Sequence, residues 1–331
     1  MRQISTPFRL ALALVLASGA SPGLATEGGS SFYLLGSGGP GAAVLPPLQG
    51  TFFDSTFYLY GGDAKAEREF TVGGNVVAGL EALIPAEFLT MLFVPTTNFL
   101  GGTLAVGATL PIGFPTVRAD AILTGPLGNQ RSLARSDSAL VLGDPVLNAN
   151  VGWKAGANSH IAAMTQVSVP IGQYRKDQLA NLAFHRWIVD TSLAYSWNDP
   201  KAGWDISAKA GVTFNGTNSY TDYNSGNEFH IEGAIEKSFS KAISAGIQAY
   251  HFEQISGDSG DGAVLGDFKG RVSAVGVTAA NNFVIGHMPA TVRARLFREF
   301  GAKNRMEGTS FFLSLSVPLR IRMPSAPPPA P

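Results

Sequence analysis

Two neighbouring stretches, residues 184–197 and 204–215, alternate between apolar and polar side chains, and this pattern restricts the fold more than any other feature. Successive side chains of an extended strand point to opposite faces. In the first stretch one face carries His185, Trp187, Val189, Thr191, Leu193, Tyr195 and Trp197. The other carries Phe184, Arg186, Ile188, Asp190, Ser192, Ala194 and Ser196. An apolar face of about ten residues with aromatic residues near both ends is typical of a strand that crosses a bilayer.

The second stretch repeats the pattern after a turn at Asn198, Asp199 and Pro200. Its apolar face carries Trp204, Ile206, Ala208, Ala210, Val212 and Phe214, and its polar face carries Asp205, Ser207, Lys209, Gly211, Thr213 and Asn215. A soluble β-sandwich also alternates, but it places apolar residues inside and polar residues in water. Charges and hydroxyls in the middle of the polar face instead favour the wet interior of a transmembrane barrel.

The N-terminus has the features of a secretory signal. Arg2 and Arg9 form a basic region, residues 10–16 (LALALVL) form a short apolar core, and small residues follow. The small residues Gly23 and Ala25 predict cleavage after Ala25, with Ala20 as the alternative site. The apolar core is too short for a transmembrane helix. We therefore expect residues 1–25 to be a removable signal peptide.

Composition supports a membrane barrel. No later stretch reaches the roughly 18 apolar residues of a spanning helix, since the nearest, 82–94, contains Pro85 and Glu87. Only 15% of the residues are charged, against about 25% in soluble domains. Basic and acidic residues balance at 24 each, and cysteine is absent. These counts argue against a nucleic-acid partner, disulfides and thiolate metal sites.

The fold expected from these patterns is all-β, a transmembrane antiparallel β-barrel over residues 50–322. Its alternating segments predict about twelve strands, with long extracellular loops and short periplasmic turns. The count becomes fourteen if residues 70–94 form two strands that turn near Ile84 and Pro85. A strand followed by a short helix in the lumen is the alternative for residues 70–94.

Other segments have less regular patterns. Residues 101–112 and 116–123 are expected to pair as a hairpin, and the polar residues 125–138 to form an exposed loop. Residues 26–49 are rich in Gly and Pro and have no period, so we expect an ordered loop or a plug at the start of the barrel. The proline-rich residues 323–331 are expected to form a periplasmic tail.

Two polar loops carry specific motifs. Residues 215–230 contain N-x-x-N-x-x-T-D-Y-x-S-G-x-x-x-H, and residues 254–262 contain Q-x-x-G-D-S-G-D-G. With residues 143–145 (GDP) and the closing pattern Glu299…Asn304-Arg305…Glu307-Gly308, the chain resembles the family labelled "putative meta-pathway of phenol degradation", also called SphA-like or transporter-like outer-membrane proteins. The resemblance covers nearly the whole mature chain. It implies an outer-membrane protein of a Gram-negative bacterium, associated with the catabolism of aromatic and other hydrophobic compounds.

The function expected from pattern and resemblance is a channel for passive uptake of hydrophobic, including aromatic, small molecules. Its partners would be the lipid bilayer, the hydrophobic substrate and, during biogenesis, the barrel-assembly machinery. The residues expected to contact ligand or line the lumen are Arg186, Asp190, Asn215, Asn218, Thr221, Asp222, Tyr223, Glu228, His230, Tyr250, Phe252, Gln254, Asp258, Asp261, Arg293, Arg295 and Glu299. No cofactor, metal or catalytic residue is expected.

Several alternatives stay open at this point. The loop motifs are also good turn formers, because Asp and Asn side chains bond to nearby backbone and Gly allows positive φ. The Asp and Gly residues of 257–262 could hold Ca²⁺, although they lack the spacing of an EF-hand. The barrel could be a non-conducting structural or ligand-binding surface protein. A third alternative is an outer-membrane hydrolase, which would need one of the five His residues beside a Ser or Asp at a lipid-accessible position.

Overall fold

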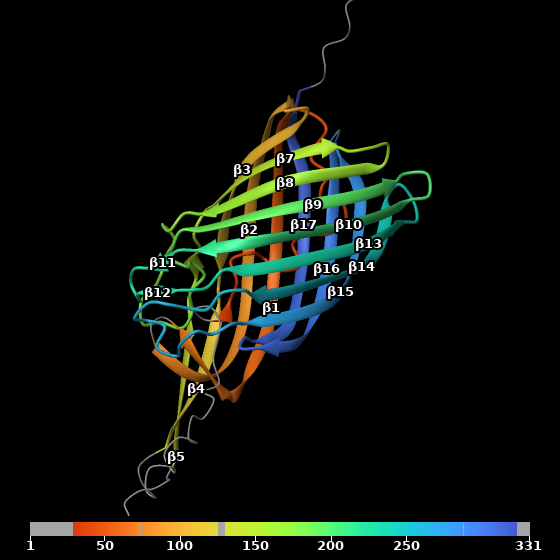
Figure 1. Ribbon diagram of the computed structural model, residues 1–331. Coiled ribbons are helices and arrows are strands. Elements are labelled where there is room, and N and C mark those ends of the chain that lie inside the picture. Colours follow the sequence, from red (N-terminus) through yellow and green to blue (C-terminus); the bar gives the residue numbers. More distant parts are fainter. Residues whose placement is uncertain (1–28, 73–74, 125–129, 287, 323–331) are drawn as a thin grey trace, which may run out of the picture.

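The protein is represented by a computed structural model that describes residues 29–322, except 73–74, 125–129 and 287 (Figure 1). The expected signal peptide, residues 1–25, and the expected tail, residues 323–331, lie outside the described residues. No helix in the described part of the chain is long and apolar enough to cross a membrane.

Twelve antiparallel strands close into a barrel, as the sequence predicts. Each strand pairs with the next around the barrel, and the last pairs with the first. The barrel strands in order are β1 (Gly50–Val72), β2 (Asn75–Phe99), β3 (Gly102–Gly113), β7 (Val146–Lys154), β8 (Ser159–Ser168), β9 (Ile188–Asp199), β10 (Trp204–Asn215), β13 (Glu228–Ser238), β14 (Ile243–Gln254), β15 (Arg271–Ile285), β16 (Met288–Lys303) and β17 (Glu307–Ile321). In the described part of the chain, closure pairs both edges of every barrel strand, and an open edge would not be tolerated in lipid.

The two ends of the barrel differ. One end, here named the loop end, carries the long connections 114–145, 169–187, 216–227 and 255–270. The other, the turn end, carries short connections such as 200–203. Short strands also lie in the long connections: β6 (Val141–Leu142), β11 (Thr217–Asn218) and β12 (Tyr223–Asn224).

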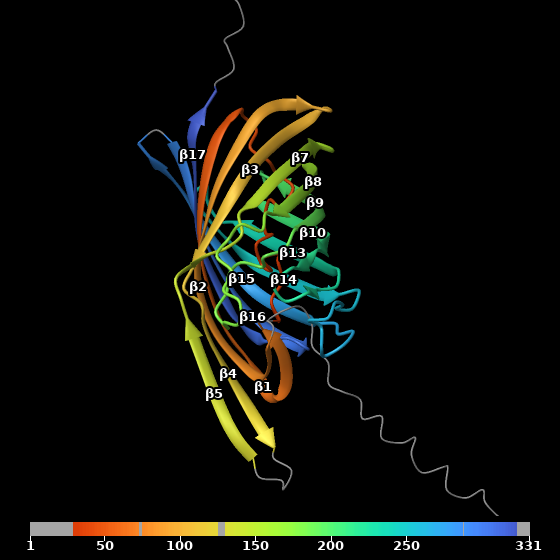
Figure 2. The same cartoon turned by 90° about the vertical axis from the view of Figure 1, so that its left-hand side faces the viewer.

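The segment after β3 departs from the sequence-based expectation. Residues 101–112 and 116–123 were expected to pair with each other, but β3 and β4 (Thr116–Thr124) instead pair with successive parts of β2. The supposed loop 125–138 contains a strand, β5 (Gln130–Ser138), which pairs with β4. The β4–β5 hairpin projects beyond the barrel (Figure 1, Figure 2). Both predictions were wrong because they considered only neighbours in sequence.

Pro85 lies inside a continuous strand, so both alternatives for residues 70–94 were wrong. Residues Ala86 to Phe99 of β2 pair with β3, and residues Leu80 to Leu83 of β2 pair with β4. Ile84 and Pro85 occupy the interval where β2 changes its partner on this side. A proline lacks the N–H that a sheet ladder requires, and it is tolerated here because the ladder is interrupted.

The alternation predicted for the strands is confirmed by burial. On β9, Asp190, Ser192 and Ser196 are buried, whereas Leu193 is 71% exposed. On β10, Ile206 and Phe214 are exposed and Lys209 is buried. Apolar side chains therefore cover the outside of the barrel, where they would face lipid, and polar side chains line the inside.

Residues 29–49, here named the N-terminal segment, cross the interior from the loop end to the turn end (Figure 2). At the loop end Gly29 lies against the ring of Phe70, near the end of β1. At the turn end the Gln49 carbonyl accepts a hydrogen bond of 2.9 Å from the Arg322 amide. A chain in this position must satisfy its backbone groups with side chains of the barrel wall.

Candidate functional site

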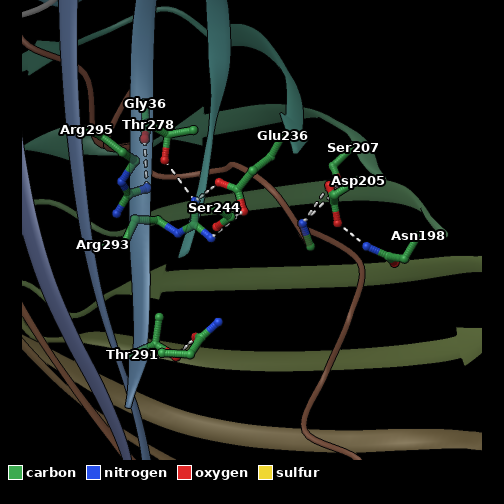
Figure 3. Close-up of polar contacts among 12 residues, drawn as sticks. Gly36, Asn198, Asp205, Ser207, Glu236, Ser244, Thr278, Thr291, Arg293 and Arg295 are labelled. Atoms are coloured by element: carbon green, nitrogen blue, oxygen red, sulfur yellow. Dashed lines mark hydrogen bonds and ion pairs between the residues drawn. The ribbon is translucent and has the colours of Figure 1, made fainter. Parts of the chain in front are cut away.

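Gly36 of the N-terminal segment is held by two opposite charges on the wall. The Gly36 amide donates to Glu232 Oε1 at 2.6 Å, and Arg295 Nη1 donates to the Gly36 carbonyl at 2.9 Å. Figure 3 shows Arg295 reaching Gly36 from β16. The φ of Gly36 is +86°, and a Cβ here would lie 2.8 Å from the Phe297 ring. Glycine is therefore required at this contact.

Two further amides of the segment bond to the wall closer to the turn end. The Gly41 amide lies 3.1 Å from Asp205 Oδ1 and 3.0 Å from Ser207 Oγ, and the Ala43 amide donates to Ser196 Oγ at 2.9 Å. Asp205 is itself held by Asn198 Nδ2 (Figure 3). The polar inner faces of β9 and β10 thus serve the backbone of the N-terminal segment.

Tyr33 joins a buried charged group on β9, β10 and β13. Its ring stacks on His230 with centroids 3.6 Å apart, and Lys209 Nζ lies 4.5 Å from its centroid. His230 Nε2 lies 2.9 Å from Asp190 Oδ2, and Thr213 Oγ1 donates to the same oxygen at 2.7 Å. Asp190 and His230 are thereby used to hold an aromatic anchor.

Arg293 forms a separate ion pair at the turn-end cavity, which is described below. It binds Glu236 through both terminal nitrogens, with Nη2 3.1 Å from Oε1. Arg293 Nη1 also donates to Thr278 Oγ1 at 2.8 Å, and Ser244 Oγ donates to Glu236 Oε1 at 2.8 Å (Figure 3). A two-pronged guanidinium–carboxylate contact fixes side-chain geometry more firmly than a single bond.

A cavity of about 230 Å³, here named the loop-end cavity, lies between the N-terminal segment and the wall. Its walls are largely apolar and come from the N-terminal segment, β1, β2, β4 and the connection before β9. They include Phe32, Leu34, Tyr58, Tyr60, Val72, Leu80, Ala82, Ile84, Phe88, Val117, Leu179 and Leu182, and its charged lining residues are Asp144, Arg186, Glu299 and Arg305. This composition suits an apolar ligand with few polar contacts.

A second cavity of about 360 Å³, here named the turn-end cavity, lies on the other side of Phe32 and Leu34. Its lining is more polar and includes Asp54, Thr90, Gln166, Arg293 and Arg295. Phe32, Leu34, Phe88 and Val146 line both cavities, and these four residues are named the junction. An apolar chamber and a polar chamber therefore meet at four apolar side chains inside the barrel.

The two motif loops bind each other around Asp258. Tyr223 donates its hydroxyl to Asp258 Oδ2, and the Gly226 amide and Gln254 Nε2 donate to Oδ1 at 3.0 and 2.6 Å. Asn215 Nδ2 donates to the Gly226 carbonyl at 2.9 Å. Burial raises the pKa of the Asp258 carboxyl above its ordinary value, against the effect of these donors. Burial of this carboxyl therefore favours the folded loops most below the ordinary aspartate pKa, and that contribution to stability is lost as pH rises through the raised pKa.

We expect Asp258→Ala to release the two motif loops without opening the barrel. The residue is 6% exposed, and each donor that it strands costs about 1–3 kcal/mol. Limited proteolysis of the membrane-embedded protein should then cut residues 216–227 and 255–270 faster, while the strands stay protected. Asp261→Ala removes a similar but exposed side chain and should change nothing. Equal cleavage in both variants would contradict the role given to Asp258.

The structure divides the predicted site residues into three groups. Facing the interior are Arg186, Asp190, Glu228, His230, Tyr250, Phe252, Arg293, Arg295 and Glu299. Within the motif loops lie Asn215 and Asn218 of the first loop and Tyr223, Gln254 and Asp258 of the contact between the two loops. Less buried are Thr221, Asp222 and Asp261. Of all these residues, Arg186, Tyr250 and Glu299 line the loop-end cavity, and Arg293 and Arg295 line the turn-end cavity.

The motif residues thus hold the two loops together around Asp258. The calcium alternative can be compared with the acidic side chains of the structure. In the described residues, no three His, Cys, Asp or Glu side chains come together as a metal group. The prediction for His185 was wrong: it precedes β9 with φ of +53° instead of lying on the outer face of a strand. Its amide donates to Asp144 Oδ2 at 2.9 Å, and its ring stacks on Tyr220.

His251 bears on the hydrolase alternative. Its Nδ1 lies 2.8 Å from Ser273 Oγ on the outer face, and Nε2 lies 3.8 Å from Glu253. A serine hydrolase also needs donors aimed at the developing oxyanion. The backbone amides of β14 and β15 are engaged in the sheet ladder around this pair. An interfacial polar contact is therefore the simpler role for His251 and Ser273.

Sequence reasoning missed several residues of the two cavities. Phe32 and Leu34 lie in a segment without a period, so no local pattern indicates that they reach the centre of the barrel. Tyr60 lies in the predicted barrel region, and Arg305 stands in the closing motif, but neither was assigned to the site. Alternation along β1 could have indicated that Tyr58 and Tyr60 face the interior. For Arg305, the available indication was its place in a polar motif between two strands.

Comparison with known proteins places the fold. No curated protein matches the chain in sequence. The structure is similar to the COG4313 outer membrane channel from Pseudomonas putida F1, with a TM-score of 0.65 and 18% identity over 84% of this chain and 98% of that chain. A Pseudomonas aeruginosa FadL homologue is more distant, with a TM-score of 0.41 and 9% identity over 84% and 93% of the two chains. The CymD monoaromatic hydrocarbon channel has a TM-score of 0.42 and 7% identity over 84% and 92%.

At 18% identity, the first of these similarities establishes the barrel fold. The sequence profile described as "Putative MetA-pathway of phenol degradation" matches residues 67–315, about three quarters of the 331 residues. The match includes both motif loops and every barrel strand from β2 to β16 in full. The resemblance inferred from the loop motifs is thus confirmed, and the chain belongs to this family.

Proposed function

We propose that this chain is an outer-membrane channel of a Gram-negative bacterium, through which hydrophobic small molecules diffuse passively. The loop end would face outward and the turn end the periplasm, because outer-membrane barrels carry their long loops outside. The catabolic context of aromatic compounds comes from the family to which the chain belongs. Its partners would be the bilayer, the substrate and, during assembly, the barrel-insertion machinery.

The observation that supports this proposal is the pair of cavities that share the junction. An apolar solute would partition from the outside into the loop-end cavity, because leaving water for an apolar wall is favourable. It would then pass Phe32, Leu34, Phe88 and Val146 into the more polar turn-end cavity. A weaker site on the exit side allows release, which a conducting path requires.

The test is uptake of a radiolabelled alkylbenzene by intact cells. Intact cells are needed because a simple phospholipid bilayer is itself permeable to such solutes, unlike the lipopolysaccharide leaflet. Deleting the gene should slow uptake, and the wild-type chain should restore it. Leu34→Trp should restore it poorly, because it adds bulk at the junction. Leu140→Trp, which changes a residue that is 70% exposed, should restore uptake fully; equal uptake with and without the gene would refute a channel.

A non-conducting ligand-binding barrel is the second candidate, and the N-terminal segment favours it. This segment crosses the interior and is anchored through Gly36, Gly41 and Ala43. Its plug role would then be permanent. The two candidates differ in solute flux, because a permanent plug allows no uptake through the barrel in the whole-cell assay.

A further inference from the structure

Arg305 is a buried cation at the loop end. It lies in the connection between β16 and β17 and is only 8% exposed, and its side chain lines the loop-end cavity. Its guanidinium lies over the Phe252 ring, 4.4 Å from the centroid. Its Nη1 atom is buried and has no hydrogen-bond partner in the described part of the chain. Buried guanidinium groups are rare unless they are paired, so an anionic partner would stabilise this group.

The nearby carboxylate of Glu299 is already satisfied. Both Tyr60 and Tyr250 donate their hydroxyls to it at 2.9 Å, one to each oxygen. The Gly308 amide adds a third bond at 2.8 Å. Three donors thus hold this charge at the wall, and among the described residues Glu299 forms no ion pair with Arg305 within 4.0 Å.

The other charges of the cavity are also engaged. Asp144 accepts bonds of 2.7 to 2.9 Å from the backbone amides of residues 172, 184 and 185. Arg186 donates through Nε to Asn215 Oδ1 at 3.2 Å and lies over the Phe184 ring. Among the four charged residues that line this largely apolar chamber, Arg305 is the one for which the described part of the chain shows a ring contact but no hydrogen bond or ion pair.

The size of the chamber limits what can sit beside this donor. An apolar cavity of about 150 Å³ is large enough to bind benzene. The loop-end cavity, at about 230 Å³, has room for one substituted aromatic ring. A guanidinium recognises carboxylates through strong, directional, charge-assisted hydrogen bonds.

We propose that the loop-end cavity is a binding site for aromatic carboxylates, with the ring against its apolar walls and the carboxylate on the guanidinium of Arg305. This rests on the proposed channel function and names a substrate class within it. A neutral aromatic compound uses the same walls but leaves the guanidinium without an anionic partner. Arg305 is the residue that distinguishes the two classes.

The test measures binding of 4-methylbenzoate and its neutral analogue 4-methylbenzamide to the purified full chain in detergent by titration calorimetry at pH 7. The wild type should bind the carboxylate at least about tenfold more tightly than the amide. Arg305→Met should abolish that preference and leave the amide affinity unchanged. Arg305→Lys keeps the charge without the planar fork, so it should retain part of the preference. The control Arg298→Met removes an exposed arginine from β16 and should alter neither affinity.

The proposal is wrong if the wild type binds both compounds equally, or if the preference survives in Arg305→Met. Heat-modifiable migration on SDS gels confirms that each variant is folded, and the lysine variant decides the matter should the methionine variant not fold. Uptake of alkylbenzene by intact cells separates the two proposals. Gene-dependent uptake without a carboxylate preference rejects only the carboxylate site. Uptake that does not depend on the gene rejects the channel, and the calorimetry then tests the role of Arg305 separately.

Discussion

Deleting residues 29–44 is expected to raise the single-channel conductance of the barrel several-fold. These residues carry Phe32 and Leu34 of the junction as well as the three anchoring amides. An eight-stranded barrel is just filled by its own side chains, whereas barrels of 16–18 strands enclose an aqueous channel. A twelve-stranded barrel without its lumenal segment should therefore hold a continuous water-filled pore.

The measurement is current across planar bilayers that contain single channels of the wild type and of the deletion variant. The barrel itself should persist, because its inward charges can be solvated by the water that replaces the segment. The control variant carries Ser37→Gly and Pro40→Gly, which changes two residues of the turn-end cavity but leaves the segment in place, and it should change conductance little. Unchanged conductance after the deletion would show that the N-terminal segment does not limit the pore.

Glu232→Ala is expected to destabilise the folded protein by about 1–3 kcal/mol, the usual loss when a buried donor is left without its acceptor. Glu232 is 5% exposed and holds the Gly36 amide at 2.6 Å. Its removal would leave the buried Gly36 amide without an acceptor.

Denaturant unfolding in phospholipid vesicles, followed by tryptophan fluorescence, measures this loss. Glu232→Gln should cost less, because the amide oxygen still accepts from Gly36 although the charge is gone. Glu253→Ala removes an exposed glutamate from the neighbouring strand β14 and should stay within about 0.5 kcal/mol of the wild type. A loss below 1 kcal/mol for Glu232→Ala would mean that the segment is not fastened at this point.

Most of the barrel strands could be predicted because alternation is a local property. On β9 and β10 the choice between lipid and lumen repeats at every second residue, so the inward position of Asp190 and Lys209 follows from the sequence. The loop motifs could be recognised for the same reason, since their turn residues lie close together in the chain. Their contact through Asp258 could not be predicted, because it joins two loops that are separated by two full strands.

The errors arose where the partner of a segment decides its structure. Pro85 is compatible with a strand because β2 changes its partner there from β3 to β4. The strand β5 forms because β4, which extends the sheet beyond β3, offers it a pairing edge. The sequence by itself determined a closed barrel with an apolar outside and a polar inside, because apolar and polar side chains alternate along each strand. Only the tertiary structure decided what the inner face contacts: the Gly36 amide meets Glu232 across 196 residues. A glycine-rich segment has no periodic pattern, so its position depends on those distant contacts.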